Sequence, residues 1–319
     1  MILLAQVLGL VFFSLILIKA TDLVIIHLKA LSIKTKLGGV FLTSLLVGLT
    51  TSLPELSVGI VSALEGIPNL SLGNIIGSNI ADLSLVAGLA TFLGGSLKIN
   101  NGATKSDLIH AFLAGAAPLI LLWDKTLSRV DGLILIFLYG FYNYFILIKR
   151  RKAVIDSEGF ITGLLRRIQH NHTGKHFMLF FLGLALLIFS SDMIVKLAVG
   201  ITSNINIPVL LVGLFLVAVG TSLPELVFEL EAVMKKESDM FMGNLMGSIV
   251  ANGTLIIGIT ALIHPIEIIA LSQYLLATIF FVITFCLFFI FIATKHRLER
   301  WEGFILILTY ALFVVLEII

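Results

Sequence analysis

The chain has 319 residues, of which 59% are hydrophobic and 13% charged, and its mean hydropathy is +1.12. A soluble domain carries about 25% charged residues, so this composition excludes an ordinary soluble protein and indicates an integral membrane protein. The net charge of +2 discriminates little, whereas the single cysteine, Cys286, excludes a disulfide framework and a thiolate metal cluster.

Apolar segments of about 20 residues recur along the whole chain, and each is long enough to cross a hydrocarbon core of roughly 30 Å as a helix. Residues 1–20 lack the basic region and cleavage site of a signal peptide, so we expect the first transmembrane helix there. The alternating strands of a transmembrane barrel are absent. We predict an all-α membrane protein with ten transmembrane helices. Their expected ranges are 2–28, 38–64, 70–95, 106–123, 130–149, 176–200, 207–233, 240–264, 271–293 and 302–318.

Basic residues indicate the orientation of these spans. The connection after the fifth span is the most basic segment, and the positive-inside rule makes it cytoplasmic. Only Lys125 and Arg129 clearly fall on the opposite side. We therefore expect a plasma-membrane protein with both termini exterior, divided into a first repeat at 1–150, a cytoplasmic linker at 151–175 and a second repeat at 176–319. The linker is too short for a regulatory domain of about 50 residues.

One polar motif occurs twice, 170 residues apart. The first copy reads TSLPE at 51–55 and GNIIGSNIAD at 73–82, and the second reads TSLPE at 221–225 and GNLMGSIVAN at 243–252. Each copy falls in a group of five predicted spans. Because five is odd, the second group enters the membrane from the opposite side. Such inverted repeats are typical of secondary transporters, whose substrate sites lie near the midplane between the halves.

The repeat reaches beyond the motifs. The segment DGLIL at 131–135 matches EGFIL at 302–306, and Asp22 matches Asp192. We regard these two aspartates as weaker functional candidates. They either tune the gating of the first and sixth spans or form hydrogen bonds between helices.

Pro54 and Pro224 fall inside the second and seventh predicted spans. Proline removes an intrahelical hydrogen bond and collides with the carbonyl four residues earlier, so we expect both helices to be broken. The freed carbonyls are tolerated at membrane depth only where they face protein or a wet cavity, and there they are good ligands for hard cations. A healed proline kink is the alternative, but the glutamate that follows each proline favours the ligand role.

Those glutamates, Glu55 and Glu225, lie near the middle of their spans. An intramembrane carboxylate costs roughly 2.5 to 3.5 kcal/mol on insertion scales. No Lys or Arg is expected at similar depth in these spans or in the two that follow them. The counter-charge is therefore a bound cation or a proton, unless the carboxyls are permanently protonated or snorkel to the interface.

Polar stripes in the third and eighth spans complete the expected site. Residues spaced by four share one face of a helix. The stripes are Asn74, Ser78 and Asp82 in the first copy, and Asn244, Ser248 and Asn252 in the second. A stripe of small residues lies beside the first of them, at Gly73, Gly77 and Ala81, and lets another helix approach closely.

The resulting set of ligands contains oxygen atoms only. It suits hard ions such as Ca²⁺, Mg²⁺ or Na⁺ and argues against Zn²⁺ or Cu⁺. Crowded carboxylates can accept one divalent ion, or several Na⁺ or H⁺ in its place. Such mutually exclusive occupancy is what an exchanger requires.

At these motifs the chain resembles the Ca²⁺:cation antiporter superfamily, and most closely its prokaryotic-type Na⁺/Ca²⁺ exchangers. That family carries GTSLPE followed by GNxxGSNxxD, or a variant that ends in Asn, in each of two repeats. The resemblance implies Ca²⁺ exchange for Na⁺ by alternating access, with the first and sixth spans as sliding gate helices. It also implies a metal-binding set, which comprises Glu55, Glu225, Asp82, Asn252, Thr51, Thr221, Ser52, Ser222, Ser78, Ser248, Gly48 and Ala218.

Two departures from the family pattern bear on ion preference. Thr50 stands where the family usually has Gly. The pair Asp82 and Asn252 is arranged opposite to exchangers with Asn in the first repeat and Asp in the second. The pseudo-symmetry makes that swap tolerable for one central site, but it leaves the Na⁺ stoichiometry open.

A third departure is Glu229, one turn after Glu225, where the first copy has Gly59. Two interpretations stay open. Glu229 either lines an inner vestibule, or it is an interfacial glutamate near Lys235 or Lys236.

Other functions are weighed against Na⁺/Ca²⁺ exchange. The nearest is H⁺/Ca²⁺ exchange, in which protonation of Glu55 and Glu225 replaces Na⁺ binding. A cation channel is less favoured, because an inverted repeat with two broken helices indicates a carrier. An intramembrane protease needs a catalytic acid pair or a motif such as HExxH, so we expect no enzyme. We expect no cofactor, no nucleic acid and no obligatory protein partner, only the transported ions and the bilayer.

Overall fold

The computed structural model describes residues 2–35, 51–99, 105–145 and 173–318, and almost all of them are helical. In the first repeat the helices are α1 (Ile2–Thr35), α3 (Leu53–Leu64), α4 (Pro68–Ala81), the π-helix η1 (Asp82–Val86), α5 (Ala87–Gly94), α6 (Lys105–Leu121), η2 (Leu122–Asp124) and a helix over 129–145. In the second they are α8 (Thr173–Ile205), α9 (Val209–Val212), η4 (Gly213–Val217), α10 (Ala218–Thr221), α11 (Leu223–Met234), α12 (Ser238–Val250), η5 (Ala251–Ile256), α13 (Ile257–Ile263), α14 (Leu271–Lys295) and α15 (Arg300–Ile318).

By length and composition, six helices of the described part are long and apolar enough to cross a membrane, or seven if a bent pair counts as one span. Two helices exceed their predicted ranges by the largest margins. α1 continues to Thr35, and α8 runs from Thr173 to Ile205. Asn206 follows α8 with a φ of 57°, the left-handed conformation that commonly ends a helix. Hydropathy marks the apolar part of a helix, whereas such backbone signals mark its end.

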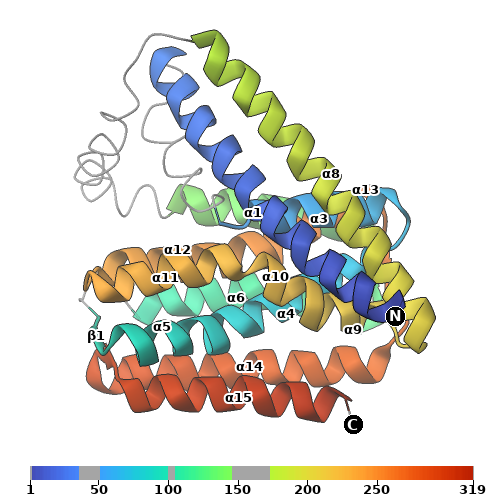
Figure 1. The fold of residues 1–319 in the computed structure, drawn as a ribbon. Helices are drawn as coiled ribbons and strands as arrows, with labels where there is room; N and C mark the ends of the chain where they lie inside the picture. The colour runs from blue at the N-terminus through green and yellow to red at the C-terminus, as the bar shows by residue number, and fades with distance from the viewer. Residues whose placement is uncertain (1, 36–50, 100–104, 146–172, 319) are drawn as a thin grey trace.

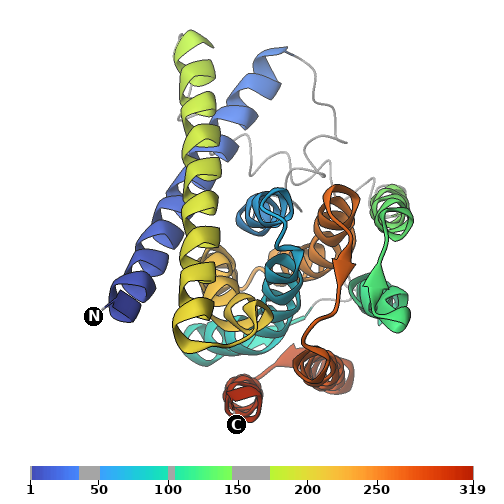
Figure 2. The same cartoon turned by 90° about the vertical axis from the view of Figure 1, so that its right-hand side faces the viewer.

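α1 and α8 form a long antiparallel pair that crosses the other helices obliquely (Figure 1). Most of the other helices run roughly alongside one another and are seen end-on in Figure 2, with the pair standing at one side. Hydrogen bonds join the pair near both ends. Asn204 donates to Gln6 over 2.7 Å, and the Nδ1 atoms of His27 and His176 are 2.9 Å apart.

Contacts between the two repeats occur in equivalent pairs. Shifting the residues of one contact by about 170 positions gives the residues of the other. The short strands are β1 (Leu97–Lys98), β2 (Thr126–Leu127), β3 (Ile266–Glu267) and β4 (Arg297–Leu298). β1 pairs with β4 and β2 pairs with β3, both antiparallel, so each strand of the first repeat pairs with one of the second. Replacing each strand by its counterpart about 170 residues away converts one pair into the other. The inverted repeat therefore appears in the fold as a pseudo-two-fold axis.

Glycines let the backbones of the two repeats approach at equivalent places. A Cβ atom on Gly88 would lie 2.7 Å from the carbonyl oxygen of Gly303, and one on Gly132 would lie 2.7 Å from that of Gly258. These two crossings are exchanged by the same pseudo-symmetry.

The predicted small-residue stripe on α4 also lies at a helix contact. A Cβ atom on Gly73 would overlap the carbonyl of Leu210, and one on Gly77 would overlap that of Leu214. α4 thus packs directly on the backbone of α9 and η4, as the stripe predicted.

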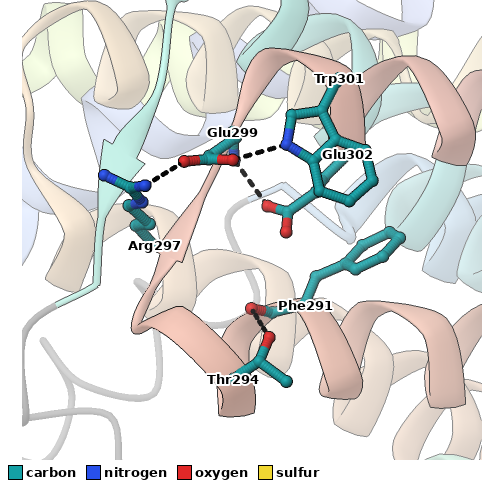
Figure 3. A network of polar contacts seen from close by, with 6 residues as sticks. All are labelled: Phe291, Thr294, Arg297, Glu299, Trp301 and Glu302. Atoms are coloured by element: carbon teal, nitrogen blue, oxygen red, sulfur yellow. Dashed lines mark hydrogen bonds and ion pairs between the residues drawn. The ribbon is translucent and has the colours of Figure 1, made fainter.

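The repeated acids Asp131 and Glu302 each lie in the first turn of a helix, the one over 129–145 and α15. The Ser128 amide donates to Asp131 over 2.8 Å, and the Glu299 amide donates to Glu302 over 2.8 Å. Both are capping interactions, which satisfy a backbone donor at a helix start. Figure 3 shows the second one, where Glu299 also accepts from the Trp301 indole. This segment of the repeat is therefore explained by helix initiation.

The glycine crossings predict opposite outcomes for two substitutions on the helix over 129–145. Gly132→Ala is expected to destabilise the protein by about 1 to 3 kcal/mol, because its methyl meets a backbone carbonyl that cannot rotate away. Gly140→Ala is the matched control, since a Cβ there has nothing within 4 Å, and it is expected to stabilise by up to about 1 kcal/mol. Thermal unfolding of detergent-solubilised protein measures both. Equal effects of the two substitutions would contradict a close crossing at Gly132.

Candidate cation-binding site

The second TSLPE motif lies at a bend in a helix. α10 ends at Thr221, α11 begins at Leu223, and the two helical segments are bent by 46°. Pro224 stands in the first turn of α11, where its missing N–H interrupts no intrahelical bond. Pro54 has the same place in α3, which begins at Leu53. The preceding part of that predicted span, with Gly48 and Thr50, lies outside the described residues.

Glu55 and Glu225 consequently occupy the first turns of α3 and α11. Their side chains are 1% and 2% exposed. The N-terminus of a helix carries a partial positive charge, so it stabilises a carboxylate within the first turn. The start of a helix one residue before each proline thus places a buried carboxylate among favourable backbone dipoles.

The threonine of each motif reaches into the opposite repeat. The Thr51 hydroxyl donates to the Asn244 carboxamide oxygen over 3.1 Å and lies 3.2 Å from the Ser248 hydroxyl. Its counterpart, the Thr221 hydroxyl, donates to the Asn74 carboxamide over 3.1 Å. It lies 3.4 Å from the Ser78 hydroxyl. The two arrangements are exchanged by the pseudo-symmetry.

The carboxylates lie between these hydroxyls. Glu55 is beside Thr221 and Ser78, and Glu225 is beside Thr51. Asp82 interacts electrostatically with Glu55 and with Glu225. Acidic groups from both repeats are therefore gathered in one region.

Many oxygens in this region have no hydrogen-bond partner among the described residues. They are both carboxylate oxygens of Glu55 and of Asp82, Oε2 of Glu225, the hydroxyls of Ser52 and Ser222, and Oδ1 of Asn252. Buried polar atoms are normally satisfied, so a cluster of unsatisfied oxygens indicates a place for a positively charged group. Oxygen atoms are the ligands that Ca²⁺ and Na⁺ take.

Acidic side chains do not complete the site alone. Within the part of the chain that the structure describes, no three Asp, Glu, His or Cys side chains converge closely enough to hold one metal ion. A divalent cation takes six to eight oxygen ligands, so hydroxyls, amides or carbonyls must supply the others.

One expected ligand, the carbonyl of Ala218, is already occupied by hydrogen bonds within the protein. The Ala218 carbonyl accepts from the Ser222 amide over 2.9 Å and from the Thr221 hydroxyl over 3.3 Å. Both of its lone pairs are therefore used within the helix bend.

Asp22 and Asp192 each form an ion pair within their own helix, in place of the hydrogen bonds between helices that were considered for them. Asp22 lies 3.6 Å from Lys19, and Asp192 lies 2.8 Å from Lys196. Both are ion pairs within one helix, three or four residues apart, and such exposed pairs contribute little.

Sequence reasoning missed the three π-helices of the described residues, η1, η4 and η5, and two of them lie at the candidate site. η1 begins at Asp82, and η5 begins one residue before Asn252. π-turns are rare and frequently occur at functional sites. A signal existed in the repeated hydroxyls of Ser84 and Thr254, which bond back to the carbonyls four residues earlier.

Two side chains of the site were also missed. Asn79 accepts from the Asn252 amide over 3.0 Å. Tyr310, on α15, interacts electrostatically with Asp82, and its hydroxyl has no partner among the described residues. A tyrosine at the equivalent position of the first repeat, Tyr139, was the available signal.

Glu229 is not an interfacial glutamate. Its side chain is fully buried, and its Oε1 accepts from the Asn244 amide over 3.1 Å. Lys235 pairs instead with Glu231, and Lys236 donates to the Ser96 carbonyl over 2.8 Å.

Known proteins resemble the chain over nearly its whole length. The family described as sodium/calcium exchanger protein matches residues 5–148 and 175–319. The putative antiporter CaxA of Alkalimonas amylolytica is 30% identical over 84% of this chain and 86% of its own. The sodium/calcium exchanger MaX1 of Methanosarcina acetivorans is 25% identical over 97% of this chain and 96% of its own. A solved structure of the sodium-calcium exchanger NCX_Mj, soaked with Na⁺ and Sr²⁺, has a TM-score of 0.62 at 22% identity and covers 99% of both chains.

The threonine bonds predict unequal costs for two equivalent substitutions. Thr221→Val leaves the Asn74 carboxamide with neither end satisfied, because its Nδ2 has no partner among the described residues. Thr51→Val leaves Asn244 still bonded to Glu229. We expect Thr221→Val to lower the free energy of unfolding by about 1 to 3 kcal/mol, and Thr51→Val by less.

Thermal unfolding in ion-free buffer measures this difference without a contribution from bound cations. Thr309→Val is the control, since that hydroxyl bonds only to the Ile305 carbonyl of its own helix, over 2.9 Å, among the interactions described. An equal or larger loss in Thr51→Val would contradict the assignment.

Proposed function

The chain belongs to the sodium/calcium exchanger family, and we propose that it is a secondary active antiporter that exchanges Ca²⁺ for Na⁺ across a membrane. The observation that carries this proposal is the pair Glu55 and Glu225. Both are buried in the first turns of equivalent helices, and both have carboxylate oxygens without a partner among the described residues. A buried charge of this kind needs a counter-ion, and a transported cation provides one.

The architecture proposed for this activity is that of ten transmembrane helices in two inverted sets of five. The second and seventh of these are broken at Pro54 and Pro224. The cation site then lies near the membrane midplane, where the two breaks face each other. Support comes from the contacts of Thr51 and Thr221, which the pseudo-two-fold axis relates to each other, and from the bend between α10 and α11.

Ca²⁺ and Na⁺ would compete for the same oxygens. We propose that Glu55 and Glu225, with nearby hydroxyls and carbonyls, bind one Ca²⁺, and that several Na⁺ spread over the same oxygens together with Asp82 and the amide of Asn252. Three carboxylates without cationic partners repel one another, so the site is stable only when cations occupy it. Occupancy by one kind of ion then excludes the other, and this exclusion couples the two fluxes.

The α1–α8 pair is proposed as the gate. It packs on α3 and on α10, the elements next to the two motifs. Ser57 of α3 and Ser191 of α8 are 2.7 Å apart, which links the pair to the helix of Glu55. A pair that is joined at both ends and crosses the other helices obliquely can slide as a unit and expose the site to alternate sides.

H⁺/Ca²⁺ exchange is the second candidate. In that mode, protons on Glu55 and Glu225 take the place of Na⁺. The third acid, Asp82, and the surrounding hydroxyls favour Na⁺, because a proton needs a single oxygen whereas Na⁺ needs several.

Ca²⁺ uptake into proteoliposomes tests the counter-ion. We expect an outward Na⁺ gradient to drive uptake at equal pH on both sides, and a pH gradient without Na⁺ to drive little. If three Na⁺ exchange for one Ca²⁺, uptake also responds to membrane potential. Uptake driven by the pH gradient alone would replace Na⁺ with H⁺, and single-channel currents would overturn the carrier mechanism.

Neutral variants check the site in the same assay. Glu55→Gln and Glu225→Gln are each expected to abolish exchange, because they remove a negative charge while keeping the side-chain size. Glu231→Gln is the matched control on α11, since Glu231 is exposed and paired with Lys235. Persistent exchange in either site variant would contradict the assignment.

We also propose that the connection after the fifth span faces the cytoplasm and that both termini face the exterior. Basic residues gathered at one end of the helices support this orientation. Around the β1–β4 pair lie Lys98 and Arg297, with Lys236 and Arg300 close to Gly95. The positive-inside rule places this end in the cytoplasm.

Cysteine labelling in intact cells tests this orientation. In a Cys286→Ala background, an impermeant maleimide is expected to label Lys125→Cys, near the β2–β3 pair, and to spare Lys235→Cys until the cells are permeabilised. The reverse pattern would invert the topology.

A further inference from the structure

Glu229 is a buried carboxyl that the proposed exchange does not use. It lies four residues after Glu225 on α11, which is about 6 Å along the helix axis. Its side chain is fully buried, and Oε2 has no partner among the described residues. In the ionised state this oxygen lacks a donor, and in the protonated state its hydroxyl lacks an acceptor. Neither state of an otherwise unoccupied carboxyl is therefore satisfied.

Among the described elements that pack closely on α11, none offers a positive charge to compensate Glu229. α11 packs on α5, α12 and η1. α5 has no titratable side chain, α12 contributes only Asp239, exposed at its first turn, and η1 contributes Asp82. Of these groups, Asp82 interacts with Glu229, and it is acidic as well. The nearby charges thus add to the need for a cation.

The pseudo-symmetric position shows that this acid is an addition to the repeat. There the residue is Gly59, and a Cβ atom on it would meet Ile256, Ser71 and Thr260 within 3.0 to 3.1 Å. No side chain fits that place without displacement. The Asn74 amide nitrogen, equivalent to the one that bonds Glu229, has no partner among the described residues. The second repeat therefore carries a carboxyl for which the first has neither space nor counterpart.

We propose that Glu229 holds one exchangeable monovalent cation, Na⁺ or H⁺, one helical turn from Glu225, which rests on the proposed antiporter function. The Asn244 amide turns its nitrogen toward Glu229 and its oxygen toward Thr51, so it supplies no further oxygen ligand here. A divalent ion needs six to eight oxygens, and a single carboxylate provides too few. A proton needs a single oxygen, and Na⁺, with half the charge of a divalent ion, loses less hydration energy when one carboxylate replaces part of its water shell.

Counter-ion dependence of Ca²⁺ uptake tests this proposal in proteoliposomes of the full chain. One arm varies internal Na⁺ at fixed, equal pH, and the other varies pH without Na⁺. We expect Glu229→Gln to weaken the apparent affinity for the counter-ion that drives wild-type uptake by about tenfold, the factor equivalent to about 1.4 kcal/mol. The uptake rate should also depend less steeply on the concentration of that ion. The Ca²⁺ concentration that gives half-maximal uptake should change less than threefold. The arm in which Glu229→Gln shifts the dependence of uptake identifies the bound counter-ion as Na⁺ or as H⁺.

Controls separate this role from a structural one. Glu231→Gln, on the same helix but exposed, should leave both arms unchanged. Glu229→Gln keeps an acceptor for Asn244, while Glu229→Leu removes it. An unchanged counter-ion dependence in Glu229→Gln, with impaired folding only in Glu229→Leu, would restrict Glu229 to orienting Asn244 and overturn the proposal.

Two further outcomes are distinguishable. If Glu229→Gln does not fold, Glu229→Asp, which withdraws the carboxylate by one methylene, is expected to weaken counter-ion affinity, and unchanged affinity there overturns the proposal. Absence of exchange in the wild type contradicts the antiporter function itself, whereas a difference confined to Glu229 variants concerns this inference alone.

Discussion

The structure depends on placing carboxylates in an apolar interior where the described residues provide no fixed cationic partner. Glu55 and Glu225 are nearly inaccessible, and Asp82 lies within electrostatic range of both. Two features of the chain offset part of this cost. Each glutamate stands in the first turn of a helix, where backbone dipoles favour negative charge, and polar side chains of both repeats surround it. In the proposed function a mobile cation offsets the remainder of the cost, so the same instability is the basis of ion binding.

Pseudo-symmetry explains how a chain of this size builds such a site. Each repeat alone contributes a carboxylate in the first turn of a helix and a polar stripe, and each threonine forms side-chain hydrogen bonds with the other repeat. The strand pairs and glycine crossings at the two ends of the bundle join the repeats in the same reciprocal manner. The site therefore exists only where both halves are packed together, and the backbone contacts at Gly88 and Gly132 set how closely they approach.

Much of this arrangement was predictable from the sequence, because the decisive residues recur at a constant offset. That offset identified both glutamates, which were expected near the middle of their spans beside a proline, and the small-residue stripe at Gly73 and Gly77 lies at a helix contact as predicted. Helical periodicity describes one face of one helix, however, and it says nothing about which distant residue lies opposite. The bonds from Thr51 to Asn244 and from Asn252 to Asn79 join positions 193 and 173 residues apart, so they required the fold. Local backbone geometry, such as the π-turn at Asp82, also depends on tertiary packing.

The departures from symmetry are more informative about ion preference than the shared motif is. Asn252 is held by Asn79, whose counterpart is the apolar Ile249, so its free amide oxygen has a fixed direction. Asp82 has a charge in place of that amide and Tyr310 nearby. Glu229 adds another carboxyl and fixes the Asn244 amide, because the flipped amide would set its oxygen against the carboxylate. The first repeat thus contributes the charge of the Asp/Asn pair, while the second contributes the additional acid, so each repeat supplies two buried carboxyls to this region but at positions that are not all equivalent.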